Sequence, residues 1–352
     1  MSDQKSASSQ PITLSDVARE AGVSRATVSL VLRDSPLVAT ETRQRVRDAV
    51  EAVGYIYNRG AANLRASKTK TVGLLVPLIS NPFFAELTIG VDAKLDAAGY
   101  VSFLANTGES IERQARFLRR MREQSVDGIV ICPVAGSTRD VLNQLDAWHM
   151  PYVQALRYVS ARDGDYVGAD YELGVEQVTE HLIRLGHRRI ALVGGDRAHS
   201  ATFSRRKGFM TAMRRHDLPA DLVLNVPPTR TAGMEAASML LKMENPPTGA
   251  VCFNDVVALG LMVGLEYLNV RPGRDFAVTG IDDVEEAAVS FPALTTVSTS
   301  PRAVGELAAD LLLRRIVTPA LATERIILPT KLIVRGSSGV GRDVDWIDLN
   351  SF

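Results

Sequence analysis

The sequence predicts an all-α helix-turn-helix head, followed by an α/β core of two doubly wound parallel-sheet lobes. Residues 13–57 contain three short amphipathic helical patterns, with a tight turn between the first two. From residue 71 onward, β-branched apolar runs alternate with amphipathic helical patterns. This alternation is typical of mostly parallel sheets that helices cover on both faces.

The three helices of the head have recognisable boundaries. A first helix is predicted over residues 14–21, and Gly22 ends it. Ser24 can cap a second helix that reaches Arg33, and a third is predicted over residues 40–53. Three short helices joined in this way form a helix-turn-helix domain.

Three segments of the chain carry no pattern of a stable core. Residues 1–12 are rich in Ser and Gln and are expected to form a disordered tail. Residues 58–70 are expected to form a hinge helix and linker, which is too short to be stable without a partner. Residues 338–352 are expected to form a C-terminal tail, and they lack the leucine heptads of a coiled coil.

The core, residues 71–337, contains about ten predicted strands in two consecutive series. The first series runs from TVGLLVP to MPYVQA, and the second begins with a helix after YVGAD and ends with a strand at RIILPTKLIVR. Two series predict two lobes with a ligand cleft between them, since open α/β sheets bind ligands beyond the carboxyl ends of their strands.

The formal net charge of zero conceals two parts of opposite sign. The whole chain has 40 Lys and Arg residues and 40 Asp and Glu residues. Residues 1–70 hold 11 of the former and 7 of the latter, a net +4, which leaves −4 for the remainder. A basic head is compatible with a nucleic-acid partner, although a solvated surface would explain the charge equally well.

Catalytic and metal-binding patterns are absent from the sequence, which therefore does not predict an enzyme, a cofactor or a metal. There is no P-loop, no G-x-G-x-x-G that opens a helix and no G-x-S-x-G. The five histidines lack the spacing of metal ligands. The alternative to a DNA-binding regulator is a sugar receptor or carbohydrate-processing enzyme that uses the same cleft.

The sequence also predicts a cytoplasmic protein without a membrane span. The first residues lack the apolar stretch of a secretory signal, and no charge-free run reaches the length of about 18 residues that would suggest a span. Cys132 and Cys252 lie in apolar runs and are expected to be buried thiols.

The head resembles a known family along its whole length. TLSDVAREAGVSRATVSLVLRDSPLVATETRQRVRDAVEAVGYIYNRGAANL is similar to the DNA-binding head and hinge of the lactose/purine repressor family (LacI/GalR-type) of bacterial transcription regulators. More loosely, VGLLVPLISNPFFAELTIGV, LGHRRIALVGG, FNDVVALG and FAVTGIDD resemble its effector-binding core, which is like periplasmic sugar-binding proteins. The resemblance covers about residues 12–337.

The resemblance implies which residues contact DNA. The second helix of such a head lies in the major groove, where Arg25 could bind guanine and Ala26 a thymine methyl. The alternative for Arg25 is a solvent-facing residue. The implied contact residues are Thr13, Ser24, Arg25, Ala26, Thr27, Ser29, Leu30, Arg33, Asn58 and Leu64.

Two of these positions, Leu30 and Leu64, carry leucine side chains. Leu30 stands where the family usually has an Arg that contacts a base, so Arg33 is a candidate substitute. Leu64 matches the hinge leucine that family members insert into a central base step, which unstacks the step and bends the duplex. The alternative for Leu64 is packing against the core.

The resemblance also implies an effector site built from Phe84, Asp170, Arg205, Asn254 and Asp282. Phe84 would stack on the effector, Arg205 would clamp it, and Asn254 and Asp282 would form hydrogen bonds to it. For the polar positions the alternative is a helix cap.

These expectations combine into one function. The chain is expected to bind a pseudo-palindromic operator in double-stranded DNA as a homodimer, as a repressor under the allosteric control of a small polar effector, a sugar or a sugar derivative. The sequence does not decide whether the effector releases the repressor or helps it to bind.

Overall fold

The computed structural model describes residues 12–56, 69–195 and 198–339 and divides the chain into two compact units, Met1–Thr69 and Lys70–Phe352. Most of the predicted N-terminal tail, the hinge and the C-terminal tail lie outside the described residues. None of the helices in the described parts is long and apolar enough to cross a membrane.

The head contains the three predicted helices, α1 (Leu14–Ala21), α2 (Arg25–Leu32) and α3 (Thr40–Val53). The α1–α2 turn forms because Gly22 adopts a left-handed conformation with φ 62°. Ser24 then caps α2, and its Oγ accepts a hydrogen bond from the Thr27 N–H at 3.1 Å. A small core, centred on the fully buried Val17, Val28 and Val46, holds the helices together.

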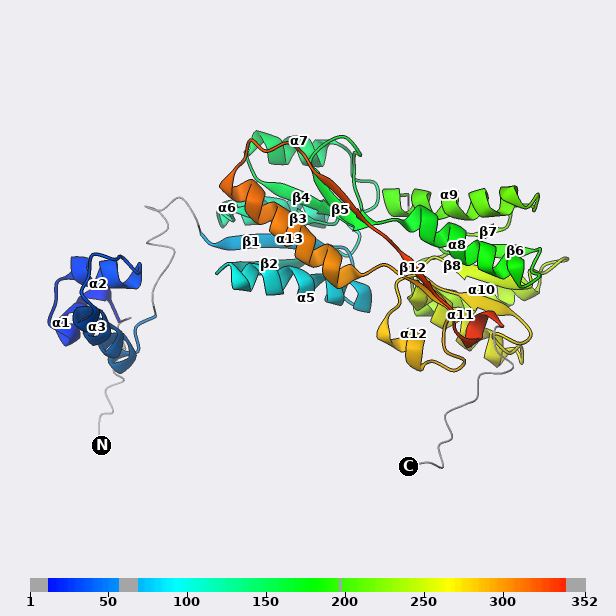
Figure 1. Ribbon diagram of the computed structural model, residues 1–352, viewed down its shortest axis with the longest axis horizontal. Helices are drawn as coiled ribbons and strands as arrows, with labels where there is room; N and C mark the ends of the chain where they lie inside the picture. Colours follow the sequence, from blue (N-terminus) through cyan, green and yellow to red (C-terminus); the bar gives the residue numbers. More distant parts are fainter. Residues whose placement is uncertain (1–11, 57–68, 196–197, 340–352) are drawn as a thin grey trace, which may run out of the picture. The chain divides into compact units, whose positions relative to one another are not determined.

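The first lobe of the core is a six-stranded sheet, whose described pairs are all parallel, in the order β11-β5-β4-β3-β1-β2. Its strands are β1 (Thr71–Val76), β2 (Val101–Asn106), β3 (Gly128–Ile131), β4 (Tyr152–Ala155), β5 (Asp165–Ala169) and β11 (Arg325–Leu328). Its helices are α5 (Pro82–Ala97), α6 (Ile111–Glu123), α7 (Asp140–Ala147) and α13 (Pro301–Val317). Figure 1 shows this lobe beside the second one.

The second lobe contains a four-stranded parallel sheet in the order β7-β6-β8-β9 and an antiparallel pair, β10-β12. Its strands are β6 (Ile190–Val193), β7 (Val223–Leu224), β8 (Gly249–Cys252), β9 (Ala277–Thr279), β10 (Thr296–Ser298) and β12 (Lys331–Ile333). Its helices are α8 (Tyr171–Arg184), α9 (Ser200–Arg215), α10 (Arg230–Leu241), α11 (Asp255–Tyr267), α12 (Glu285–Val289) and the short 3₁₀ helix η1 (Gly336–Ser338).

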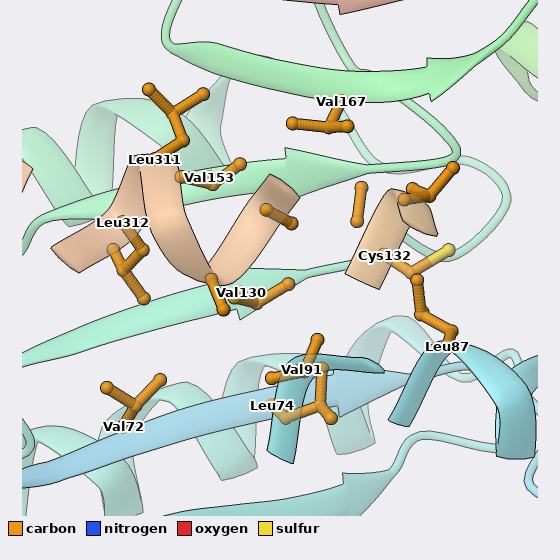
Figure 2. Packing of buried hydrophobic residues seen from close by; sticks show 14 of the residues in the cluster. Val72, Leu74, Leu87, Val91, Val130, Cys132, Val153, Val167, Leu311 and Leu312 are labelled. Atoms are coloured by element: carbon orange, nitrogen blue, oxygen red, sulfur yellow. The ribbon is translucent and has the colours of Figure 1, made fainter. Parts of the chain in front are cut away.

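Helices cover both faces of each parallel sheet, as predicted. In the first lobe, α5 and α13 pack on one face and α6 and α7 on the other. Figure 2 shows the first of these faces, where Leu87, Leu311 and Leu312 meet valines from four adjacent strands. In the second lobe, α8 and α9 cover one face and α10 and α11 the other. Cys132 and Cys252 are free thiols buried in these cores.

The division of the chain between the lobes differs from the prediction of two consecutive series. Helix α13 and strand β11 come late in the sequence but belong to the first lobe. RIILPTKLIVR, predicted as one strand, forms β11 and β12 in different sheets, with Pro329 between them. YVGAD, treated as a boundary, contributes to β5. Apolar periodicity reports that a segment is a strand but not which sheet it joins.

Close packing of glycine against backbone fixes α13 on α5. A Cβ atom on Gly305 would lie 2.2 Å from the Leu87 carbonyl oxygen, and one on Gly90 would lie 2.1 Å from that of Arg302. The two helices approach this closely because neither glycine carries a side chain at the contact.

We expect Gly305→Ala to destabilise the core by about 1–3 kcal/mol, because the added methyl group overlaps backbone atoms that cannot rotate away. Helix propensity alone would change stability in the opposite direction by about 1 kcal/mol. Chemical denaturation measures the difference, with Glu306→Ala on the same helix as control. Equal or greater stability of Gly305→Ala would contradict the assigned contact.

Candidate functional site

The exposed start of α2 carries two of the residues predicted to contact DNA. Val28 and Val31 are buried against α1 and α3, while Arg25 and Ala26 are exposed at the start of the helix. Arg25 forms no ion pair or side-chain hydrogen bond with the described residues of the head. Its guanidinium is therefore available to a ligand outside the protein.

Ser29, Leu30 and Arg33 lie further along α2. Ser29 and Leu30 are half-buried, and Arg33 is exposed. Arg33 folds back on its own helix, where its Nε donates to the Ser29 carbonyl oxygen at 3.0 Å and its Nη2 to the Ser29 Oγ at 2.9 Å. The structure thus holds the proposed substitute for the missing arginine in an intrahelical contact.

Thr13 and Thr27 also take part in helix capping. Thr13 donates from both its N–H and its Oγ1 to Asp16 Oδ2, at 2.9 and 2.8 Å. These two hydrogen bonds, more than the nearby Arg19, lower the pKa of Asp16. The Thr27 hydroxyl lies 2.9 Å from the Ser24 hydroxyl. Asn58 and Leu64 lie outside the described residues.

A cavity between the two lobes of the core brings together four of the five residues predicted for the effector site. Phe84 comes from α5 in the first lobe, and Arg205, Asn254 and Asp282 come from the second lobe. The cavity has a volume of about 40 Å³. Its remaining lining residues are Leu78, Asn81, Phe83, Glu109, Leu156, Arg157, Tyr171, His199, Ala201, Pro228 and Phe253.

Arg205 and Asp282 form an incomplete charged pair in this cavity. Both side chains are buried, at 6% and 4% exposed, and Arg205 Nη2 lies 3.6 Å from Asp282 Oδ1. The guanidinium carbon of Arg205 lies 3.9 Å from the ring centre of Tyr171 and 4.5 Å from that of Phe253, which fixes its plane. Burial raises the pKa of Asp282 well above its ordinary value, although Arg205 opposes this shift.

Two polar atoms of this pair have no hydrogen-bond partner among the described residues. They are Arg205 Nε, a donor, and Asp282 Oδ1, an acceptor. A buried polar atom without a partner costs about 1–3 kcal/mol, so a bound group that satisfies both atoms would gain stability. A hydroxyl group accepts from one atom and donates to the other.

Asn254 and Asp170 are helix caps, as the alternative reading anticipated. Asn254 Oδ1 accepts from the Val257 N–H at 3.0 Å at the start of α11, which leaves its amide nitrogen as a donor for a ligand. Asp170 Oδ1 accepts from the Leu173 N–H at 3.0 Å at the start of α8. Asp170 lines a neighbouring cavity instead of this one, so the structure does not group it with the other four residues.

The cavity also contains a second charged pair, which was not predicted from the sequence. Arg157 Nη1 donates to Glu109 Oε1 at 2.8 Å, and both side chains are nearly buried. Glu109 also accepts from the Ala135 N–H at 3.1 Å. Both charged residues follow the carboxyl ends of strands, β2 and β4, which is the signal that could have identified them.

No group of three or more His, Cys, Asp or Glu side chains among the described residues is arranged to hold a metal ion. The lining of the cavity presents charged, aromatic and amide groups, which suit a polar organic ligand.

Comparisons with known proteins agree with this geometry. Residues 13–58 match the family described as bacterial regulatory proteins, lacI family, and residues 179–338 match a periplasmic binding protein-like domain. The maltose regulon regulatory protein MalI of Escherichia coli (strain K12) is 34% identical over 342 residues, which cover 93% of this chain and 99% of that protein.

Two solved structures are similar over nearly the full chain. The lac repressor dimer bound to operator and the anti-inducer ONPF has a TM-score of 0.85 at 25% identity and covers 94% of this chain and 99% of its own. The complex of the transcriptional regulator CelR with cellobiose has a TM-score of 0.71 at 32% identity and covers 93% and 99%. The chain therefore belongs to the lacI family of bacterial regulatory proteins.

Proposed function

We propose that this protein is a sequence-specific transcriptional repressor that binds operator DNA as a homodimer and is controlled by a sugar in the cavity between its lobes. The observation that carries the sugar proposal is the buried pair of unsatisfied atoms, Arg205 Nε and Asp282 Oδ1. A repressor of chromosomal genes acts in the cytoplasm, where reduced thiols such as Cys132 and Cys252 persist.

The charges around the cavity favour a neutral effector. Arg157 and Glu109 lie in the first lobe and Arg205 and Asp282 in the second, so each lobe contributes one arginine and one carboxyl group. A carboxylate or phosphate ligand would meet the acidic members, whereas neighbouring hydroxyl groups match both signs. Phe84 supports this assignment, because aromatic faces pack against the apolar faces of sugar rings.

Exposed apolar residues on both lobes support a dimer. One set, the first-lobe patch, contains Ile89, Val101, Phe103 and Leu104 on α5 and β2. The other, the second-lobe patch, contains Val263, Tyr267, Val289 and Phe291, of which the last three are 77–79% exposed. The second-lobe patch borders a groove of about 570 Å³. In Figure 1, α5 and α12 lie along the same lower side of the core. Large exposed apolar patches often mark protein interfaces.

In the proposed complex, α2 lies in the major groove with Arg25 and Ala26 at base edges. We expect Arg25→Ala to change base preference, at a cost of about 1–3 kcal/mol at the contacted position, because a bidentate contact to guanine is lost. Arg19→Ala is the matched control, since it removes the same charge from an exposed site on α1. Selection from randomised operators measures both, and an unchanged preference for Arg25→Ala would refute its proposed role.

We expect Tyr267→Glu combined with Phe291→Glu to dissociate the dimer, because the charges would become buried in an apolar interface. Sedimentation should report a fall from twice to once the chain mass of 38.1 kDa. Val317→Glu is the control, because Val317 is also a highly exposed apolar residue and lies outside both patches. A double variant that remains dimeric would place the interface elsewhere.

We expect Asp282→Asn to weaken sugar binding by at least about thirtyfold, since truncating one partner of a buried charged contact costs about 2 kcal/mol or more. Gel shifts with promoter fragments of neighbouring genes, with and without cellobiose, maltose and ribose, measure operator binding and its response to each sugar. Asp170→Asn is the control, because asparagine still caps α8 and the residue lies outside the cavity.

The outcome of this experiment separates two parts of the proposal. A wild-type response that persists at the same sugar concentration in Asp282→Asn would place the effector site elsewhere. No specific retardation of any promoter fragment would contradict the proposed repressor function itself.

A further inference from the structure

We propose that Asp255 is a positioning residue of the effector site, which holds the turn that presents Asp282 to the cavity. This inference rests on the proposed function of the cavity. Asp255 is fully buried and does not line the cavity, so it would act through Asp282 and not by contact with the effector.

The turn that carries Asp282 has a backbone that needs support. Asp282 has φ 121° and Asp283 has φ 58°, both in the region that side chains other than glycine rarely adopt. Such residues persist only where surrounding contacts determine their conformation. The Asp282 N–H donates to the Val297 carbonyl oxygen at 2.8 Å, and Asp283 pairs with Arg335 Nη2 at 2.8 Å.

Asp255 contacts the backbone on both sides of this turn. Its own N–H donates to the Ile281 carbonyl oxygen at 2.8 Å, and its Oδ2 accepts from the Val284 N–H at 2.9 Å. Its Oδ1 accepts from the Thr296 hydroxyl on β10. One buried carboxylate thus connects the start of α11, the end of the turn and the neighbouring strand.

The backbone before the turn is shaped to admit this carboxylate. A Cβ atom on Gly280 would lie 2.1 Å from Asp255 Oδ1. The glycine therefore allows a contact that any side chain would prevent. Burial raises the pKa of Asp255 to about 6, while its hydrogen bonds to Thr296 and Val284 lower it, and Asp283 acts to raise it.

A pair of isosteric variants separates positioning from general stability. Thr296→Val removes the hydroxyl that binds Asp255, whereas Thr279→Val removes an equally buried hydroxyl that donates to the Ala250 carbonyl oxygen at 3.2 Å. Asp255→Asn is the second test variant. It keeps the size of the side chain but replaces one acceptor oxygen by a donor group.

Hydrogen–deuterium exchange of the full-length variants tests the turn without any ligand. We expect the amides of residues 281–284 to exchange about tenfold faster in Thr296→Val and in Asp255→Asn, because one hydrogen bond to a charged group is lost. Their exchange should be unchanged in Thr279→Val. Equal exchange of this segment in Thr296→Val and Thr279→Val would overturn the proposal.

Calorimetry with cellobiose, maltose and ribose tests the link to binding. A sugar that binds the wild type should bind Thr296→Val about tenfold more weakly and should bind Thr279→Val with unchanged affinity. The two variants should have the same operator affinity and the same melting temperature as each other. Equal sugar affinity of the two variants would also overturn the proposal. If none of the three sugars binds the wild type, the proposed effector class fails, and the exchange experiment still decides the role of Asp255.

Discussion

The arrangement of the core depends on the chain passing between its two lobes three times. The passages follow β5, β10 and β11, because α13 and β11 return to the first lobe before β12 rejoins the second. Two of the passages are bonded to each other: the Asp170 N–H donates to the Leu328 carbonyl oxygen at 3.0 Å, and the Thr330 hydroxyl to the Asp170 carbonyl oxygen at 3.3 Å. Connecting segments of this kind are where hinge rotation of two lobes takes place, and because residues of both lobes line the cavity, such a rotation would change its contacts.

The electrostatics of the cavity couple ligand binding to that motion. The cavity of about 40 Å³ is lined by polar groups from both lobes, so a ligand bound there can contact both lobes at once. Each lobe contributes one charged pair, and the pair in the second lobe retains unsatisfied atoms. A ligand that satisfies groups on both lobes stabilises whichever lobe arrangement allows all contacts together. It can shift the protein between arrangements only by its difference in affinity for them.

Local chemistry could be predicted from the sequence, whereas long-range pairing could not. Gly22 predicts the turn after α1, and Ser24 predicts the N-cap of α2. Both features can be predicted because they depend only on residues next to each other in the sequence. The family resemblance groups Arg205, Asn254 and Asp282, and Asn254 and Asp282 also follow the carboxyl ends of predicted strands. The Glu109–Arg157 pair joins residues 48 positions apart, and the contacts of Asp255 depend on a turn and a strand distant in sequence. Apolar periodicity gives no information on contacts between distant segments of the sequence. For the same reason, β11 and β12, which join different sheets, were predicted as one strand.

In the head, the leucine at position 30 changes which side chains of α2 can make polar contacts with bases. Leu30 cannot donate or accept a hydrogen bond, so any specific polar contact from the middle of α2 must come from another side chain. Arg33 would have to give up two hydrogen bonds to Ser29 before it reached a base, and each such bond contributes about 0.5–1.5 kcal/mol. A new bidentate contact worth about 1–3 kcal/mol would barely offset that loss. Arg25 has no such competing contacts in the described head, so recognition by α2 should depend mainly on its first turn. At Leu30, apolar contact with a thymine methyl is then more favourable than a polar contact supplied by Arg33.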